Sequence, residues 1–146
     1  MRFVMFMIPA VYQGAESRKA GVDFTPPADA VERMMKYNEQ LANAGALISL
    51  DGLHSPATAA RVSFRNGKPT TTDGPFVESK EVVGGYWMIR AKSREEAIEW
   101  ARKVPADDGD IVEVRQVFEM EEFPEDVRKA AESETVRKAI GETQKS

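Results

Sequence analysis

The chain has 146 residues, of which 42% are hydrophobic and 30% charged, a composition typical of one folded domain and unlike that of a disordered chain. It contains no cysteine and one histidine, which excludes disulfides, cysteine nucleophiles and a multi-histidine metal centre within one chain, and suits a reducing compartment. The net charge is −4, and neither residues 1–118 nor residues 119–146 carry a basic excess. The sequence therefore predicts no direct contact with nucleic acid and implies no cofactor and no metal.

The chain begins with an apolar run, Phe-Val-Met-Phe-Met-Ile at residues 3–8, which predicts a strand buried on both faces in the middle of a sheet. The run is too short to span a membrane and has no small-residue cleavage site after it. We therefore expect a cytoplasmic protein with no membrane partner. The polar residues 11–27 that follow are long for a plain connection and predict either a functional flap or a partly mobile segment.

Two helices are predicted from apolar residues that recur every three or four positions. The first covers residues 28–44, with Pro27 suited to its first turn and Gly45 suited to ending it. The second starts at the capping-box pattern of Ser93 and Glu96 and ends at Pro105.

Strands are predicted at residues 46–53, 60–65, 68–72, 82–91 and 110–118. Asn66-Gly67 predicts a tight hairpin between 60–65 and 68–72, which we expect at the edge of the sheet. Gly84-Gly85 predicts a bulge or a close backbone approach.

This order of elements predicts an α+β domain of the ferredoxin-like βαββαβ type over residues 1–118, an antiparallel sheet with both helices on one face. The other face needs a cover, so we expect a symmetric homodimer through the sheet face. Residues 119–146 are predicted to form a tail that contains a helix, and this helix begins at Pro124. The favoured interpretation is a surface helix that frays into a disordered end, and the alternative is an arm that docks on the partner.

The turn Asp73-Gly74-Pro75-Phe76 is the most informative motif, because glycine and proline fix the backbone and so aim the side chains of Asp73 and Phe76. An aspartate in a turn more often bonds its own backbone. His54, in a loop after the second strand, would become a general acid or base if its ring bonded Asp73. A lone histidine is more often simply packed or solvated.

Phe76 and four further side chains are candidates for binding a ligand. Glu78, Lys80 and Arg115 would fix a polar or anionic molecule if they lined the cleft, although charged residues at strand ends usually face water. Tyr86 and Trp87 must point to opposite faces of the sheet, and we expect Tyr86 to reach the cleft.

Several separated motifs occur together in this chain: Asp-Gly-Pro-Phe, Glu78, Lys80-Glu81, Gly84-Gly85-Tyr86, Ala-Ile-Glu-Trp-Ala at 97–101 and Glu-Val-Arg at 113–115. In these motifs the chain resembles the DGPF-containing branch of the YCII-related proteins. The resemblance covers most of residues 1–118. It implies a dimeric α/β barrel with a cleft in each subunit, where a His-Asp pair has been proposed as a pseudo-catalytic dyad. By this resemblance, the pair is His54 and Asp73.

The resemblance settles no reaction, and three hypotheses follow. The first is a cofactor-free enzyme that acts on a small polar molecule, with His54 moving a proton and Asp73 orienting it. The second is a ligand sensor or protein-binding regulator that works with an extracytoplasmic-function sigma factor, as proposed for some members of the family. The third leaves the turn as a determinant of the fold alone.

Overall fold

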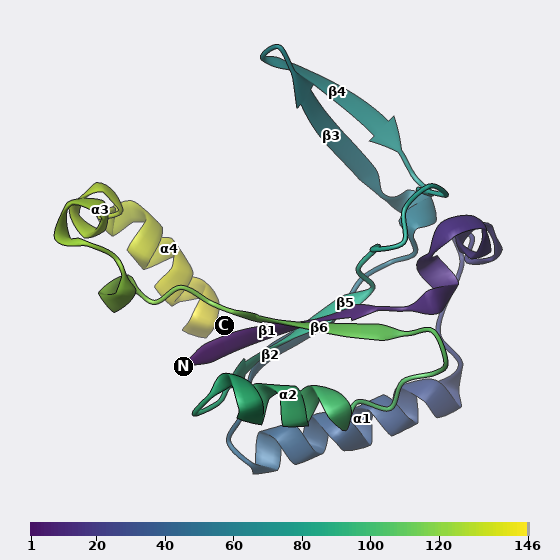
Figure 1. The fold of residues 1–146 in the computed structure, drawn as a ribbon, viewed down its shortest axis with the longest axis horizontal. Coiled ribbons are helices and arrows are strands. Elements are labelled where there is room, and N and C mark those ends of the chain that lie inside the picture. Colours follow the sequence, from purple (N-terminus) through teal and green to yellow (C-terminus); the bar gives the residue numbers. More distant parts are fainter. Residues whose placement is uncertain (146) are drawn as a thin grey trace.

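A four-stranded antiparallel sheet with two helices on one face forms the centre of the molecule (Figure 1). The structure is a computed structural model, and it describes residues 1–145. The sheet has the order β2 (Leu47–Gly52), β5 (Gly85–Arg90), β1 (Arg2–Ile8), β6 (Ile111–Gln116). The helices are α1 (Ala28–Asn43) and α2 (Arg94–Arg102). The predicted α+β class and ferredoxin-like arrangement are confirmed.

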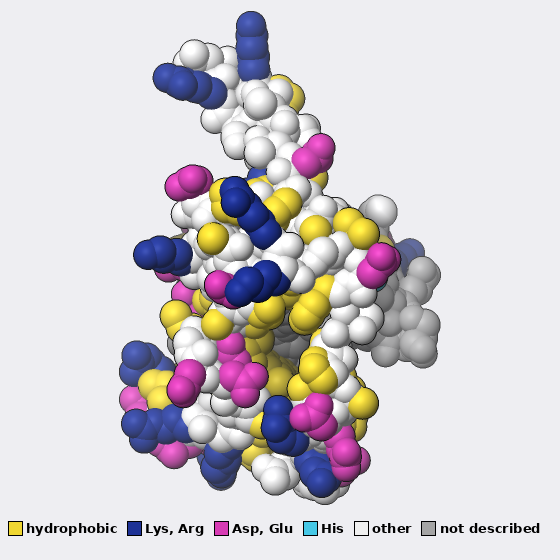
Figure 2. Space-filling model, turned by 90° about the vertical axis from the view of Figure 1, so that its right-hand side faces the viewer, with side chains coloured by type: hydrophobic (Ala, Val, Ile, Leu, Met, Phe, Trp, Pro, Cys, Tyr) yellow, Lys and Arg dark blue, Asp and Glu magenta, His cyan; other side chains and the backbone are white. Residues whose placement is uncertain are grey.

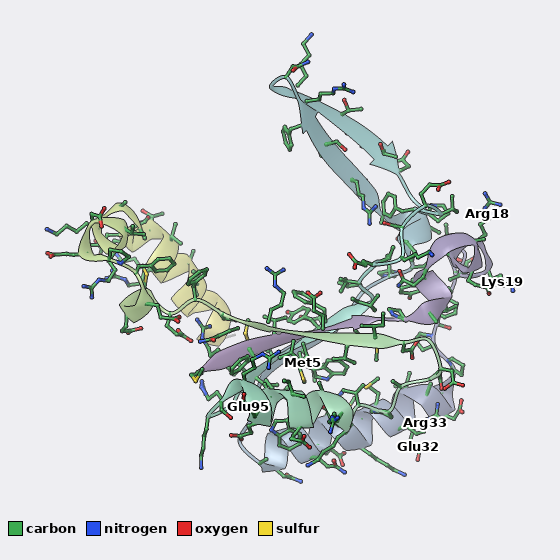
Figure 3. All side chains as sticks on the ribbon, viewed as in Figure 1. Met5, Arg18, Lys19, Glu32, Arg33 and Glu95 are labelled. Carbon is green, nitrogen blue, oxygen red and sulfur yellow. The ribbon has the colours of Figure 1, made fainter. Side chains whose placement is uncertain are left out.

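The core lies between the sheet and the two helices. In β1, Phe3 and Met5 point to the helices, and their neighbours in β5, Ile89 and Trp87, point the same way because opposite residues share a face. Figure 3 shows Met5 between the sheet and the helix layer. The other buried members of this core are Tyr37, Leu41, Ala46, Ala91, Ala97 and Val104.

Both helices form where the sequence predicts them. α1 follows Pro27, and after it Gly45 takes a φ of +70°, which a side chain would disfavour. In α2 the Ser93 hydroxyl accepts a hydrogen bond from the backbone N–H of Glu96 at 3.1 Å, and this satisfies one of the free donors at the helix start.

The hairpin of β3 (Ala60–Arg65) and β4 (Lys68–Asp73) also forms, with the positive φ at Asn66 (51°) and Gly67 (75°) that its turn needs. Its predicted place at the edge of the main sheet is wrong, because β3 and β4 make a separate two-stranded sheet that projects from the molecule (Figure 1). Every residue of both strands is exposed. β5 pairs directly with β2 instead, so the hairpin is an insertion between two neighbouring strands.

Residues 10–19 form the 3₁₀ segments η1 (Ala10–Tyr12) and η2 (Gly14–Lys19), a more regular conformation than the predicted flap. The Gln13 side chain fixes this region, since its amide N–H groups donate to the carbonyls of Pro9 (2.7 Å) and Val82 (2.8 Å) and its oxygen accepts from the Val82 N–H (2.8 Å). Tyr12 and Ala20 are buried with Val82, and Phe24 packs against them. The segment is thus part of the packed structure.

The sheet face away from α1 and α2, called the open face below, carries Val4 and Phe6 of β1, Tyr86 and Met88 of β5, and Arg115 of β6. The first four are half-buried. The hairpin rises at one end of this face and the C-terminal helices rise at the other (Figure 1).

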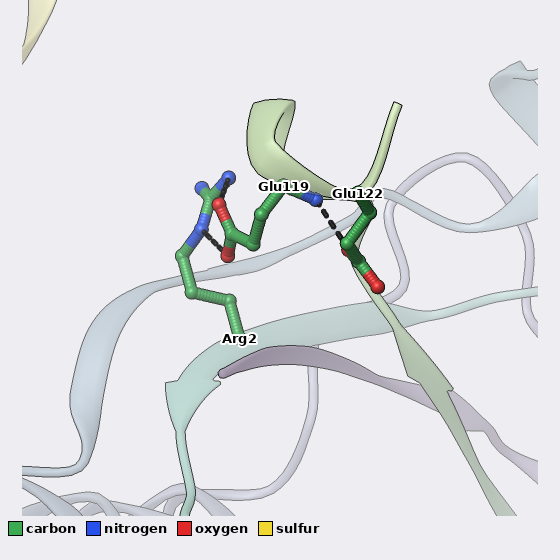
Figure 4. A network of polar contacts seen from close by, with 3 residues as sticks. All are labelled: Arg2, Glu119 and Glu122. Carbon is green, nitrogen blue, oxygen red and sulfur yellow. Dashed lines mark hydrogen bonds and ion pairs between the residues drawn. The ribbon is translucent and has the colours of Figure 1, made fainter. Parts of the chain in front are cut away.

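The tail begins with η4 (Met120–Glu122) and continues as α3 (Glu125–Ala130) and α4 (Glu134–Lys145), so the helix predicted from Pro124 is present and a second one follows it. Arg2 ties β1 to the tail by two bonds to the Glu119 carboxylate, at 2.8 and 3.1 Å, and the Glu119 N–H donates to the Glu122 carboxylate at 2.7 Å (Figure 4). The predicted frayed end includes residue 146, which lies outside the described residues.

Candidate functional site

The turn at Asp73-Gly74-Pro75-Phe76 is seated directly on the segment that follows His54. The Gly74 N–H donates to the Ala59 carbonyl at 2.8 Å, and an ideal Cβ on Gly74 would lie 1.8 Å from the Pro56 carbonyl oxygen. Pro56 is buried, as is Ser55, whose hydroxyl donates to the carbonyl of Ala20. The turn, residues 55–59 and the end of the 3₁₀ region therefore meet in one place, which only glycine at position 74 permits.

Phe76 is held from the side of the hairpin. The Arg61 guanidinium lies 3.9 Å from the centre of the Phe76 ring, a cation–π contact, and donates a hydrogen bond to the Ser79 hydroxyl at 3.1 Å. The Ser79 carbonyl in turn accepts from the Gly14 N–H at 2.9 Å. The base of the hairpin, the turn and the 3₁₀ region thus form one connected unit.

His54 and Asp73 flank this contact, since His54 precedes Ser55-Pro56 and Asp73 precedes Gly74. Both residues are exposed, and within the described residues neither side chain makes a hydrogen bond or ion pair. The fold brings their backbone segments together without joining the two side chains. The predicted His-Asp pair stays a prediction.

The other predicted ligand-binding residues lie in different surroundings. Glu78 and Lys80 are exposed in the loop between the hairpin and β5. Arg115 is exposed on the open face, opposite Val4 of β1. In the part of the chain that is described, none of these three charged side chains has an ion pair or a side-chain hydrogen bond.

Tyr86 is half-buried and donates a hydrogen bond from its hydroxyl to Asp51 Oδ2 at 2.9 Å. This bond, together with burial and the negative charge of Asp51, raises the pKa of Tyr86 above its ordinary value. Asp51 was missed by the reasoning from sequence. Its position in the strand at 46–53 was visible, but its pairing with Tyr86 depends on the register between β2 and β5.

Two adjoining cavities open between α1 and the end of the sheet, and we call them together the end slot. One has a volume of about 140 Å³ and the other about 260 Å³, and both are lined by Met7, Met34 and Gly84. The smaller reaches Asp51, Gly52 and Tyr86 at the sheet edge, and the larger reaches Tyr12, Phe24 and Arg33. Figure 2 shows this end of the molecule as a hollow lined by hydrophobic side chains, with charged side chains around its rim.

Three polar side chains in the wall of the end slot are already paired with the protein. Asn38 accepts a hydrogen bond from the indole N–H of Trp87 at 2.8 Å, and Asp51 accepts from Tyr86. Both oxygens of Asp110 accept backbone N–H groups, of Ala10 and of Asp107, at 2.8 Å each. Arg33 lies on the outer surface of α1 near this end (Figure 3) and has no ion pair within the described residues.

The segment that carries His54 is tethered to the end slot. The Leu53 N–H donates to the Gly84 carbonyl at 2.9 Å, and Gly52 is part of the cavity wall. Gly84 itself is packed so closely that a Cβ there would lie 2.7 Å from the ring of Pro9, which confirms the predicted close approach at Gly84-Gly85. His54 therefore follows the wall of the cavity by two residues.

The described residues hold no group of three or more histidine, aspartate or glutamate side chains placed to bind a metal ion. Within residues 1–145, no helix combines the length and the apolar character that crossing a membrane requires.

The family model of the YCII-related domain matches residues 1–121, which is most of the chain. A protein of Rhizobium meliloti (strain 1021), described as uncharacterised, is 32% identical over 75 residues, which are 49% of this chain and 60% of that protein. The match thus spans less than two thirds of the relative's length. On the family match, the chain belongs to the YCII-related proteins.

Proposed function

We propose that this YCII-related protein binds a small molecule in the end slot and acts on it by acid/base chemistry without a cofactor, with His54 as the group that moves a proton and Asp73 as the group that orients the imidazole ring. One observation carries the proposal: Gly74, which follows Asp73, is in close contact with Pro56 and Ala59, in the segment that begins two residues after His54. The contact is made by backbone atoms and includes the hydrogen bond from the Gly74 N–H to the Ala59 carbonyl.

The end slot supports this proposal because it adjoins the His54 segment through Gly52 and the Leu53–Gly84 hydrogen bond. Its wall is mainly apolar, which favours a molecule with an apolar body. The lining also includes Arg33, Asp107 and Asp110, so the polar end of that molecule would meet charges of both signs. A bound molecule that reached His54 would draw the ring into contact with Asp73, since catalytic hydrogen bonds often tighten only when substrate is present.

The protein that carries out this reaction is expected to be a homodimer through the open face. Val4, Phe6 and Met88 lie there half-buried and would be covered by a second sheet. The closed barrel that results would also shield one side of the Tyr86–Asp51 pair.

A binding function without turnover is the second candidate, and the chemistry of the slot favours it. Asn38, Asp51 and Asp110 each accept a hydrogen bond from a protein donor, so these side chains are held in place as parts of a binding wall. A protein that binds and does not convert its ligand would act as a sensor. Its expected partner, by family resemblance, is an extracytoplasmic-function sigma factor.

A screen of small organic acids and amines by thermal shift, followed by mass spectrometry of the recovered compounds, tests the proposal. Wild-type protein, His54→Ala and Met34→Trp are compared, the last because a larger side chain would fill the slot. Binding to wild type and His54→Ala, loss of binding in Met34→Trp, and conversion by wild type alone would support catalysis. Binding without conversion would support the sensor.

The single histidine allows a direct test of the pair, because its ring nitrogens give one set of nitrogen-15 signals. With ligand bound, Asp73→Asn should change the ratio of the two neutral tautomers of His54, while Asp29→Asn on α1 should leave it unchanged. Equal spectra for wild type and Asp73→Asn would show that Asp73 does not orient the ring.

A further inference from the structure

We propose that the hairpin β3–β4 docks on the acidic segment of a second copy of this chain, where the acidic segment means residues 118–127. This interface is additional to a contact between sheet faces, because it is made by two projecting parts of the chain. It also includes a part of the tail that lies outside the matched family region.

The hairpin has one apolar face and a basic tip. Val62 and Phe64 lie on the same face and are 53% and 74% exposed, and Pro69 lies opposite Phe64 in the register of the two strands. Arg65 and Lys68 form the last pair before the turn. Neither has an ion pair among the described residues, so both positive charges are available to a partner.

The acidic segment has the complementary composition. Phe118, Met120 and Val127 are 72%, 45% and 40% exposed. Five carboxylates and no Lys or Arg lie between residues 119 and 126. Glu119 is paired with Arg2 and Glu125 with Lys129. The other three, Glu121, Glu122 and Asp126, have no ion pair within the described part of the chain.

The Phe118 ring is stacked on that of Phe123, with centroids 4.9 Å apart, so the exposed apolar surface is held in a fixed shape. Exposed apolar side chains in a row that are flanked by charge of one sign are typical of a surface that binds a partner. Here the partner of opposite charge is present in the same sequence.

The arrangement of the two arms fits a symmetric dimer. The hairpin and the tail rise on the same side of the sheet, at opposite ends of the open face (Figure 1). A two-fold axis parallel to the sheet and perpendicular to its strands turns one open face onto the other and exchanges the ends. Each hairpin then meets the acidic segment of the other chain, and the contact occurs twice.

A charge-swap experiment tests the pairing of these two surfaces. The hairpin variant is Arg65→Glu with Lys68→Glu, and the tail variant is Glu121→Lys with Asp126→Lys. Each variant alone places like charges in both contacts, so we expect the dissociation constant of the dimer, measured by sedimentation velocity, to rise about tenfold or more. Mixed in equal amounts, the two variants should form a heterodimer in which opposite charges meet in both contacts.

Native mass spectrometry distinguishes the heterodimer from both homodimers by mass. The matched control is Lys36→Glu with Lys103→Glu, which changes the net charge by the same amount on α1 and after α2 and should leave the dimer intact. A second variant is Phe64→Ser, which removes a large apolar side chain from an exposed strand. It should weaken the dimer and leave the circular dichroism spectrum unchanged.

Three results would overturn the proposal. They are a wild-type protein that is monomeric at all concentrations, swapped variants that stay apart when mixed, or a control that weakens the dimer as much as the hairpin variant does. Two results together would support the proposal. Added salt should weaken the wild-type dimer, and the two variants should form the heterodimer when they are mixed.

Discussion

The backbone of Gly74 touches the carbonyl oxygen of Pro56 so closely that an ideal Cβ at position 74 would lie 1.8 Å from that oxygen. The obstacle is backbone and not the end of a flexible side chain. Any substitution at this position must therefore move the turn away from residues 55–59.

Gly74→Ala should lower the free energy of unfolding by about 2 kcal/mol or more, because the turn and the Pro56 segment must separate. It should also weaken any ligand effect that depends on His54 and Asp73 being neighbours. Urea unfolding followed by tryptophan fluorescence measures the first effect. Gly21→Ala is the control, since nothing lies within 4 Å of a Cβ there, and a loss as large in that variant would contradict the explanation.

Gln13→Ala should release the 3₁₀ region from the segment before β5. The substitution removes three hydrogen bonds and leaves the N–H of buried Val82 without a partner, which we expect to cost about 1–3 kcal/mol. Amide hydrogen exchange at Val82 should become faster while exchange in β1 changes little. Gln40→Ala, on the exposed surface of α1, provides the comparison.

Asp51→Asn should lower the pKa of Tyr86 toward 10.0, because the hydrogen bond to the carboxylate and its negative charge both raise it. A raised pKa in the folded state stabilises the protein below the ordinary tyrosine value, and this contribution is lost as the pH rises through the folded-state value. The stability difference between wild type and Asp51→Asn should therefore be present at neutral pH and shrink in alkali.

An absorbance titration of the three tyrosines follows this change. Burial raises the pKa of both Tyr12 and Tyr37, so the transition that moves in Asp51→Asn should be the one that is absent from Tyr86→Phe. An unchanged titration would show that the Tyr86–Asp51 bond does not persist in solution. Asp29→Asn controls for the loss of one charge.

Glu119→Gln should destabilise the protein in a pH-dependent way. The hydrogen bond from Arg2 and the positive charges nearby hold the pKa of Glu119 below its ordinary value of 4.5. Its stabilising effect is complete above that pH and is lost as the pH falls through the lower, folded-state value. Melting temperatures of wild type and Glu119→Gln should differ at neutral pH and converge in acid. Glu39→Gln, on the exposed surface of α1, is the control and should leave the melting temperature close to that of wild type.

The sequence predicts the local structure well where short patterns control it. The cap at Ser93 and Glu96, the proline before α1 and the Asn66-Gly67 turn each determine the backbone over a few residues, and all three predictions are confirmed. The position of the hairpin could not be predicted in this way. Alternation within residues 60–72 indicates strands, but it does not say which strands they pair with.

The candidate site depends on contacts between distant residues, and this limits what the sequence reveals. Asp51 and Tyr86 are 35 positions apart, and Gln13 and Val82 are 69 apart, so both contacts follow from strand register and not from any motif. The Asp73-Gly74 motif predicted a turn, and the chain bends at Gly74. The surface on which the turn rests, at Pro56 and Ala59, became visible only in the fold.

The central position of β1 has a consequence for how the protein is made. β1 is synthesised before the other strands of the sheet, and its two neighbours are Gly85–Arg90 and Ile111–Gln116. An emerging chain must therefore keep the apolar residues of β1 out of contact with other proteins until most of the domain has left the ribosome. We expect newly made chains to depend on chaperones during that interval, and Met5 and Phe6 to be within the segment that those chaperones bind.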